Sequence, residues 1–155
     1  MRQSRSKIIE AGSFISDIVY RFRQTHSGVA VQVKVDKINS IEADPELVDA
    51  AVTNVILNAI SFADEGSTIE VLVITNTDTV SVSVLNKGPI IDGDPDKCFG
   101  PFHSSRATVS GEHHGLGLYL VRLIAEHYGG SATICNLADG SGVHVTITFP
   151  AARSL

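Results

Sequence analysis

Apolar residues near the start of the chain recur first at a helical spacing and then at a strand spacing. Between residues 13 and 23, five of them fall at the 3–4 residue intervals that predict an amphipathic helix. They are Phe14, Ile15, Ile18, Val19 and Phe22. From Val29 to Val35 a valine then occupies every second position, which predicts a strand with one buried face.

A second helix is predicted from Asp44 to about Ala63. Asp44 is suited to cap the helix and Pro45 to occupy its first turn, and residues 64–66 (Asp-Glu-Gly) end it. A broad apolar stripe along this segment predicts that the helix packs on a sheet. The stripe contains Leu47, Val48, Ala51, Val52, Val55, Ile56, Ala59 and Ile60.

The second half of the chain predicts four strands and one more helix. Strands are expected at 68–75 and 80–86, joined by a hairpin turn, and at 131–136 and 142–149 around the Gly-rich turn 139–142. A helix is expected over 115–128, ended by Gly129-Gly130. Residues 87–114 form a long irregular stretch, which indicates a functional loop. The predicted fold class is an α/β (α+β) two-layer sandwich, with a mixed, mostly antiparallel sheet covered on one face by about three helices.

Composition narrows the class of protein. The 155 residues suit one globular domain, with 43% hydrophobic and 19% charged residues. The net charge of −5 argues against a nucleic-acid partner. Apolar runs are too short for a membrane span or a signal peptide, so no direct membrane contact is expected. Cys98 and Cys135 make no disulfide framework, which favours reduced thiols in the cytoplasm.

The helix 44–63 carries a row of polar side chains. Asn54, Asn58 and Ser61 share one face at the edge of the apolar stripe. Asparagine is a mediocre helix former, and its amide oxygen is a ligand that Mg²⁺ accepts. The alternative is two solvated or locally bonded amides.

Two glycine-containing segments complete the candidate chemistry. Residues 111–118 place glycines before a helix, where backbone N–H groups bind phosphate. Such a segment could also be a plain connection, and it matches neither a P-loop nor a Rossmann fingerprint. Residues 86–89 (Asn-Lys-Gly-Pro) follow a strand and could be only a turn. His103, His113 and His114, near Cys98, match no zinc-binding spacing.

Taken in order, these segments resemble the Bergerat-type (GHKL) ATPase superfamily, and most closely the catalytic ATP-binding domain of bacterial sensor histidine kinases. Residues 54–59 are similar to the N box, 84–89 to the first glycine box, 99–106 to the F box with its basic residue, and 115–121 to the second glycine box. The resemblance covers about residues 29–150.

The resemblance implies roles for individual residues. Asn58 would bind the Mg²⁺ that bridges the ATP phosphates, and Asn54 would support it. Phe62 would pack on adenine, and Asn86 would face the adenine amino group. Asn54, Asn58 and Arg106 are the implied catalytic residues. The implied nucleotide-binding set is Asn54, Asn58, Phe62, Asn86, Gly88, Arg106, His114, Gly115, Leu116, Gly117 and Leu118.

The implied function is transfer of the γ-phosphate of Mg·ATP to a histidine on a separate dimerisation and phosphoacceptor domain, within a two-component system. None of the six histidines resembles a phosphoacceptor, so the acceptor is expected elsewhere. Residues 1–12 are expected to be a flexible or connecting segment, 13–151 the catalytic domain and 152–155 a tail. The expected fragment is a cytoplasmic monomer of a kinase whose parent could sit in the inner membrane, and it meets the response regulator only indirectly.

Four positions depart from the family pattern. Asn86 replaces an aspartate, Ile90 and His113 replace glycines, and Ser61 replaces a lysine. Asn86, Ile90 and His113 favour an alternative, a degenerate ATP-sensing or protein-binding module on the same fold. A second alternative is a protein serine kinase of the anti-sigma type. Related hydrolases carry a glutamate where this chain has Asn54, which favours transfer to histidine over hydrolysis.

Overall fold

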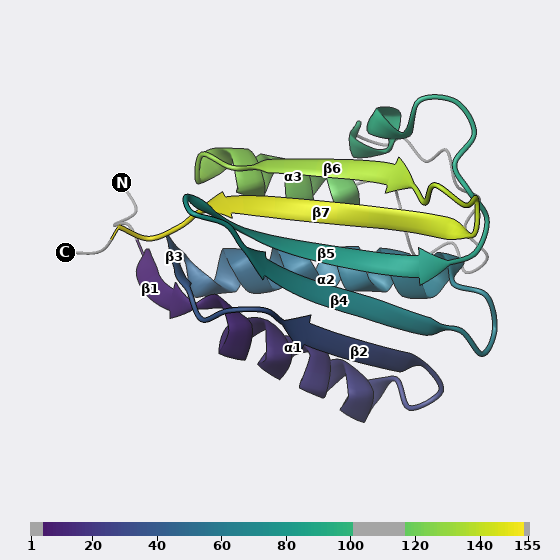
Figure 1. The fold of residues 1–155 in the computed structure, drawn as a ribbon, viewed down its shortest axis with the longest axis horizontal. Helices are drawn as coiled ribbons and strands as arrows, with labels where there is room; N and C mark the ends of the chain where they lie inside the picture. Colours follow the sequence, from purple (N-terminus) through teal and green to yellow (C-terminus); the bar gives the residue numbers. More distant parts are fainter. Residues whose placement is uncertain (1–4, 101–116, 154–155) are drawn as a thin grey trace.

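The main sheet has five strands in the order β2-β4-β5-β7-β6 (Figure 1). A computed structural model describes residues 5–100 and 117–153. The strands are β2 (Ala30–Val35), β4 (Thr68–Thr75), β5 (Thr79–Lys87), β6 (Ser131–Asn136) and β7 (Gly142–Pro150). The β2–β4 pair is parallel and the other three pairs are antiparallel. The predicted mixed, mostly antiparallel sheet is confirmed.

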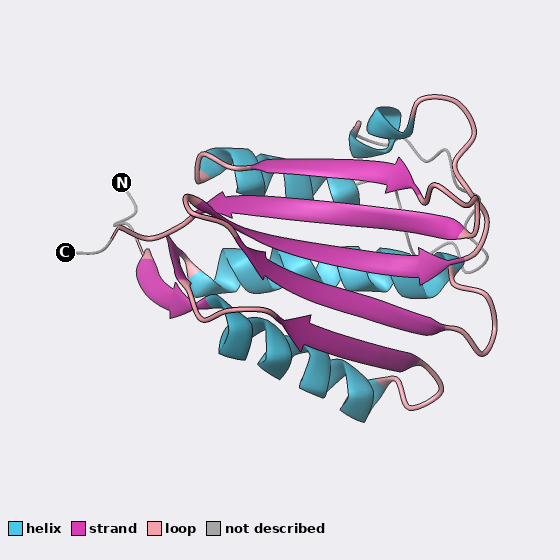
Figure 2. Ribbon diagram, in the orientation of Figure 1, coloured by secondary structure: helices cyan, strands magenta, loops and turns pink. Residues whose placement is uncertain are grey.

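Three helices cover one face of this sheet: α1 (Ala11–Thr25), α2 (Pro45–Phe62) and α3 (Gly117–His127) (Figure 2). The strands alternate apolar and polar residues, so the sheet has one apolar face, and the helices pack on that face. In β5, for example, Val80, Val82 and Val84 are buried beneath the helices, whereas Ser81 and Leu85 point to the open face. The two-layer sandwich predicted from the sequence is therefore confirmed.

Helix α2 lies in the middle of the helical layer and follows its sequence signals. The Asp44 carboxylate accepts from the Glu46 N–H at 2.9 Å, and Pro45 occupies the first helical position. The helix ends at Phe62, one residue before the predicted limit. Its buried stripe is Val48, Ala51, Val52, Val55, Ile56, Ala59 and Phe62.

A second sheet of two short strands was not predicted. β1 (Lys7–Glu10) pairs antiparallel with β3 (Ser40–Ala43), and Ile9 and Ile41 are buried there. Residues 7–12, part of the segment 1–12 that was expected to be flexible or connecting, form β1 and the start of α1. Strands of four residues are too short to show a periodic pattern, and the partner of β1 is about thirty residues away. The division of the chain into a domain and a connection stays a prediction.

At the end of the sandwich where β5 finishes, the end of α2 lies beside the end of β5 (Figure 1). The beginning of α3 lies further back along α2, beside Asn54. After β5 the chain runs through residues 88–94 into a short 3₁₀ helix, η1 (Pro95–Phe99). Among the described residues, no helix combines the length and the apolar character needed to cross a membrane.

Candidate functional site

Asn86 is a polar side chain in an apolar layer. It continues the inward-facing series of β5 after Val84 and is only 3% exposed. Its Nδ2 is buried and has no hydrogen-bond partner in the described parts of the chain. A buried amide without a partner costs about 1–3 kcal/mol. Such a group is therefore expected to meet a partner from outside the described residues.

The backbone around Asn86 is fixed from two sides. On one side, the Gly88 N–H donates to the Ser141 carbonyl at 3.0 Å. On the other, the Asp64 N–H, just beyond α2, donates to the Lys87 carbonyl at 2.8 Å. Gly142 packs so closely that a Cβ there would lie 1.9 Å from the Asn86 carbonyl oxygen. The Asn86 side chain therefore projects from a rigid support.

Gly88 brings the end of β5 against the end of α2. A Cβ at Gly88 would lie 2.2 Å from the Phe62 carbonyl oxygen, and 3.4 Å from Asn86 Nδ2. The resemblance places this glycine in the nucleotide-binding set, but the close approach of the Phe62 backbone alone already requires a glycine here. The structure thus brings together Phe62, Asn86 and Gly88, three residues of the predicted nucleotide-binding set.

Asn54 joins α2 to the beginning of α3. Its Nδ2 donates to the Ala50 carbonyl at 2.8 Å, so one half of this amide is bonded within the helix. Its Oδ1 lies 3.4 Å from the position of a Cβ on Gly117, the first residue of α3. Asn58 follows one turn later and is half-buried. The Asn54 oxygen therefore lies beside a helix N-terminus, where backbone N–H groups bind anions.

The remaining predicted site residues divide into two groups. The Leu118 side chain is 6% exposed and belongs to the core, so only its backbone could serve a ligand. Arg106, His114, Gly115 and Leu116 lie outside the described residues, as do His103 and His113.

The segment 88–100, here called the strap, is held to the sheet by Asn136. The Ile91 N–H donates to Asn136 Oδ1 at 2.8 Å, and Asn136 Nδ2 donates to the Ile91 carbonyl at 3.0 Å. Ile91 is 2% exposed, whereas Ile90 is 45% exposed. The Ile90 side chain, which replaces a family glycine, therefore points largely to solvent.

Arg122 of α3 holds the other end of the strap. Its guanidinium lies 4.0 Å from the centre of the Phe99 ring, forms an ion pair with Asp96 and donates to the Ala132 carbonyl at 3.2 Å. The hydrogen bond from Arg122 lowers the pKa of the Asp96 carboxyl. Sequence reasoning missed both Arg122 and Asn136, because neither belongs to a local motif and their partners are distant in the chain.

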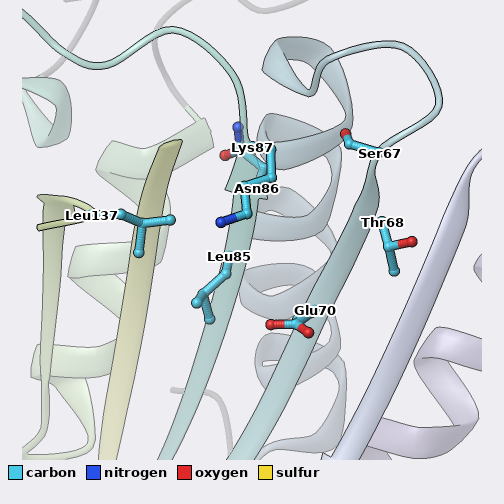
Figure 3. A pocket seen from close by; sticks show the side chains of 7 residues that line it. All are labelled: Ser67, Thr68, Glu70, Leu85, Asn86, Lys87 and Leu137. Carbon is cyan, nitrogen blue, oxygen red and sulfur yellow. The ribbon is translucent and has the colours of Figure 1, made fainter. Parts of the chain in front are cut away.

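A pocket on the opposite face of the sheet is a different feature (Figure 3). Its lining includes Glu70 and Leu85, which point away from the helices (Figure 3). Asn86 borders it, but Asn54, Asn58, Phe62 and Gly88 do not. We therefore place the candidate site on the helical side of the sheet.

The donors of the candidate site fit Mg·nucleotide better than a metal held by protein alone. The described residues contain no group of three or more His, Cys, Asp or Glu side chains that could hold a metal ion. Asn58 contributes a neutral amide, and Mg²⁺ typically binds few protein groups when phosphates and water complete its shell. The buried Asn86 Nδ2 offers a hydrogen bond to a ligand.

Comparison with known proteins identifies the family. The sequence profile of the histidine kinase-, DNA gyrase B- and HSP90-like ATPases matches residues 43–153. The chain belongs to this family. The sensor protein ChvG of Agrobacterium fabrum is 38% identical over 111 residues, which are 66% of this chain and 19% of ChvG. The chain thus spans about a fifth of that relative. The resemblance to histidine kinases found in the sequence is confirmed.

Solved structures agree with this member of the ATPase family in fold. The nucleotide-free catalytic domain of histidine kinase ThkA has a TM-score of 0.81 at 25% identity, covering 94% of this chain and 95% of that domain. Full-length ShkA in complex with AMPPNP has a TM-score of 0.78 at 20% identity, covering 99% of this chain and 32% of ShkA. The second likeness shows the fold alone.

Proposed function

We propose that this domain binds Mg·ATP between α2, the end of β5 and the start of α3, and presents the γ-phosphate to a histidine on a separate phosphoacceptor domain. One observation carries the proposal: the buried Nδ2 of Asn86 has no partner in the described chain, beside the close approach of Gly88 and Phe62. A ligand with a polar edge satisfies that amide. The structure of full-length ShkA, part of which has the same fold, is a complex with the ATP analogue AMPPNP, which supports nucleotide binding in general.

Each described residue would act through position and charge. Asn86 would hydrogen-bond the polar edge of the base, and Phe62 would pack on the base. Asn58, one turn beyond Asn54, would place its amide oxygen at the Mg²⁺ that neutralises phosphate charge, and Gly117 at the start of α3 would offer its N–H to phosphate. Phosphoryl transfer depends mainly on such positioning and electrostatic stabilisation.

Asn54 supports the proposed type of reaction. Hydrolysis needs a base that activates water, and an amide is no base. The Asn54 amide also uses its Nδ2 within α2, in the bond to Ala50. Transfer to a histidine, which is itself the nucleophile, does not require that base. The phosphoacceptor domain, with the response regulator as its onward partner, completes the proposed two-component pathway.

The binding claim is tested by calorimetric titration with a non-hydrolysable ATP analogue, with and without Mg²⁺. We expect micromolar, Mg²⁺-dependent binding that Asn58→Ala weakens at least tenfold, the loss expected for one charge-assisted contact. Asn76→Ala, in the exposed turn between β4 and β5, is the matched control and should bind normally. An Asn58→Ala affinity equal to that of the wild type would remove Asn58 from the site.

A second candidate function is nucleotide sensing without transfer, which Asn86 in the place of the family aspartate favours. Transfer is tested by mixing the domain with radiolabelled ATP and the phosphoacceptor domain of its parent protein. An acid-labile phosphoprotein supports the histidine kinase, and an acid-stable one indicates a serine kinase. Tight binding with neither product would establish the sensing module.

A further inference from the structure

Asn86 differs from a carboxylate in the hydrogen bonds that it can make with a base. We propose that Asn86 lets the base subsite accept 6-oxopurine nucleotides, such as inosine and guanosine triphosphates, beside adenine nucleotides. The inference rests on the proposed function, because it concerns the nucleotide of the same site. Beyond adenine nucleotides, the site would then bind 6-oxopurine nucleotides, and Asn86 would be the residue that determines this.

The chemistry depends on the donors and acceptors that each group presents. A carboxylate only accepts hydrogen bonds, so it suits the amino group at position 6 of adenine and repels the oxygen of a 6-oxopurine. An amide has both an acceptor and a donor. Its oxygen can accept from the adenine amino group while its nitrogen donates to N1. After a half-turn, its nitrogen donates to the purine O6 while its oxygen accepts from N1–H.

The structure leaves the Asn86 amide able to make that half-turn. Its buried Nδ2 has no hydrogen bond in the described chain that would hold one orientation. Asn136, on β6 two strands across the sheet from β5, shows the contrast: its Oδ1 and Nδ2 are both bonded to the Ile91 backbone, so a turn would break two bonds. The hydrogen bonds to Ile91 therefore fix the orientation of the Asn136 amide. The orientation of the Asn86 amide would instead depend on the bound ligand.

We assign discrimination at this subsite to the Asn86 side chain, because the backbone that carries it is closely packed. A Cβ on Gly142 would lie 1.9 Å from the Asn86 carbonyl oxygen, and a Cβ on Gly88 would lie 2.2 Å from the Phe62 carbonyl oxygen. Within residues 5–100 and 117–153, no charged side chain is bonded to Asn86: the adjacent lysine of the strand, Lys87, donates to Ser141 Oγ at 2.9 Å. A neutral amide in a fixed frame therefore faces the polar edge of the base.

The test compares Mg·ATP with Mg·ITP, since inosine differs from adenosine only in the 6-oxo group and its N1 proton. For the wild type we expect the two dissociation constants to agree within about tenfold, since each base forms two bonds with the amide. Asn86→Asp should raise the ratio of the ITP dissociation constant to the ATP dissociation constant by a further factor of about ten or more. The variant loses the hydrogen-bond donor, and its carboxylate repels the purine O6. GTP is measured as the second 6-oxopurine.

Asn76→Asp controls for an added negative charge and should leave the ratio unchanged. A wild type that rejects ITP more than about a hundredfold relative to ATP overturns the inference without any variant. An unchanged ratio in a folded Asn86→Asp variant also overturns it. Absence of ATP binding to the wild type is a separate outcome, because it removes the proposed function and the inference with it.

Discussion

The backbone N–H of Asp44 donates to the hydroxyl oxygen of Tyr128 at 3.0 Å, which ties the start of α2 to the residue after α3. The two residues are 84 positions apart in the chain. Asp44 also caps α2, so the bond fixes the N-terminal end of this helix. Asn54 and Asn58 lie further along the same helix.

Tyr128→Phe should lower the free energy of unfolding by about 1–2 kcal/mol, because it leaves the part-buried Asp44 N–H without its acceptor. Urea denaturation measures the loss. Tyr20→Phe removes a hydroxyl from a side chain that is 61% exposed and should change stability little. Equal midpoints for the two variants would contradict the role given to this bond.

Gly88→Ala should destabilise the domain by about 1–3 kcal/mol or more, because the new Cβ would lie 2.2 Å from the Phe62 carbonyl oxygen. The measurement is made without nucleotide, so it does not depend on the proposed function. Gly28→Ala is the control, since nothing lies within 4 Å of a Cβ there. If Gly88→Ala is as stable as the control, the glycine is explained by a ligand and not by the α2 backbone.

Asn136→Ala should loosen the strap, residues 88–100, because both bonds to the Ile91 backbone are lost. The expected loss of stability is about 1–3 kcal/mol, with faster amide hydrogen exchange at Ile91. Cys135→Ala, at the neighbouring exposed position of β6, should leave that exchange rate unchanged. Unchanged protection of Ile91 in Asn136→Ala would mean that other contacts hold the strap.

Glu10→Gln should alter the dependence of stability on pH. The Glu10 carboxylate accepts from Ser13 and from the Gly12 N–H at the start of α1, which lowers its pKa from the usual 4.5. A lowered folded-state pKa means that the stabilisation is present above pH 4.5 and is lost as the pH falls through the folded value.

Wild type should therefore exceed Glu10→Gln by about 0.5–1 kcal/mol at pH 7, a modest figure because the carboxylate contacts water. The difference should shrink below pH 4.5 and vanish in stronger acid. Glu65→Gln, in the exposed turn after α2, is the control. A difference that grows on acidification would contradict the capping role.

Regular periodicity was enough to predict the main elements of the fold. Helix α2 carries its own start signal, Asp44-Pro45, and a long apolar stripe, so its limits were predicted to within one residue. The five main strands are six to nine residues long, and β4, β6 and β7 alternate buried and more exposed positions along most of their length. These signals are local, because a segment that buries one face must repeat apolar residues at the period of its own backbone.

The family was also predictable, since the boxes around Asn54, Asn58, Asn86 and Gly117 are local motifs in a fixed order. The residues of the candidate site come from the same boxes and stay a prediction. Only the tertiary structure showed that Asn54 lies beside Gly117, that Gly88 meets Phe62, and that Asn86 is buried with its Nδ2 without a protein partner. β1 and β3, Asn136 and Arg122 were likewise missed. Their contacts join segments far apart in the chain, and such pairings depend on packing geometry, which leaves no repeated pattern in the sequence.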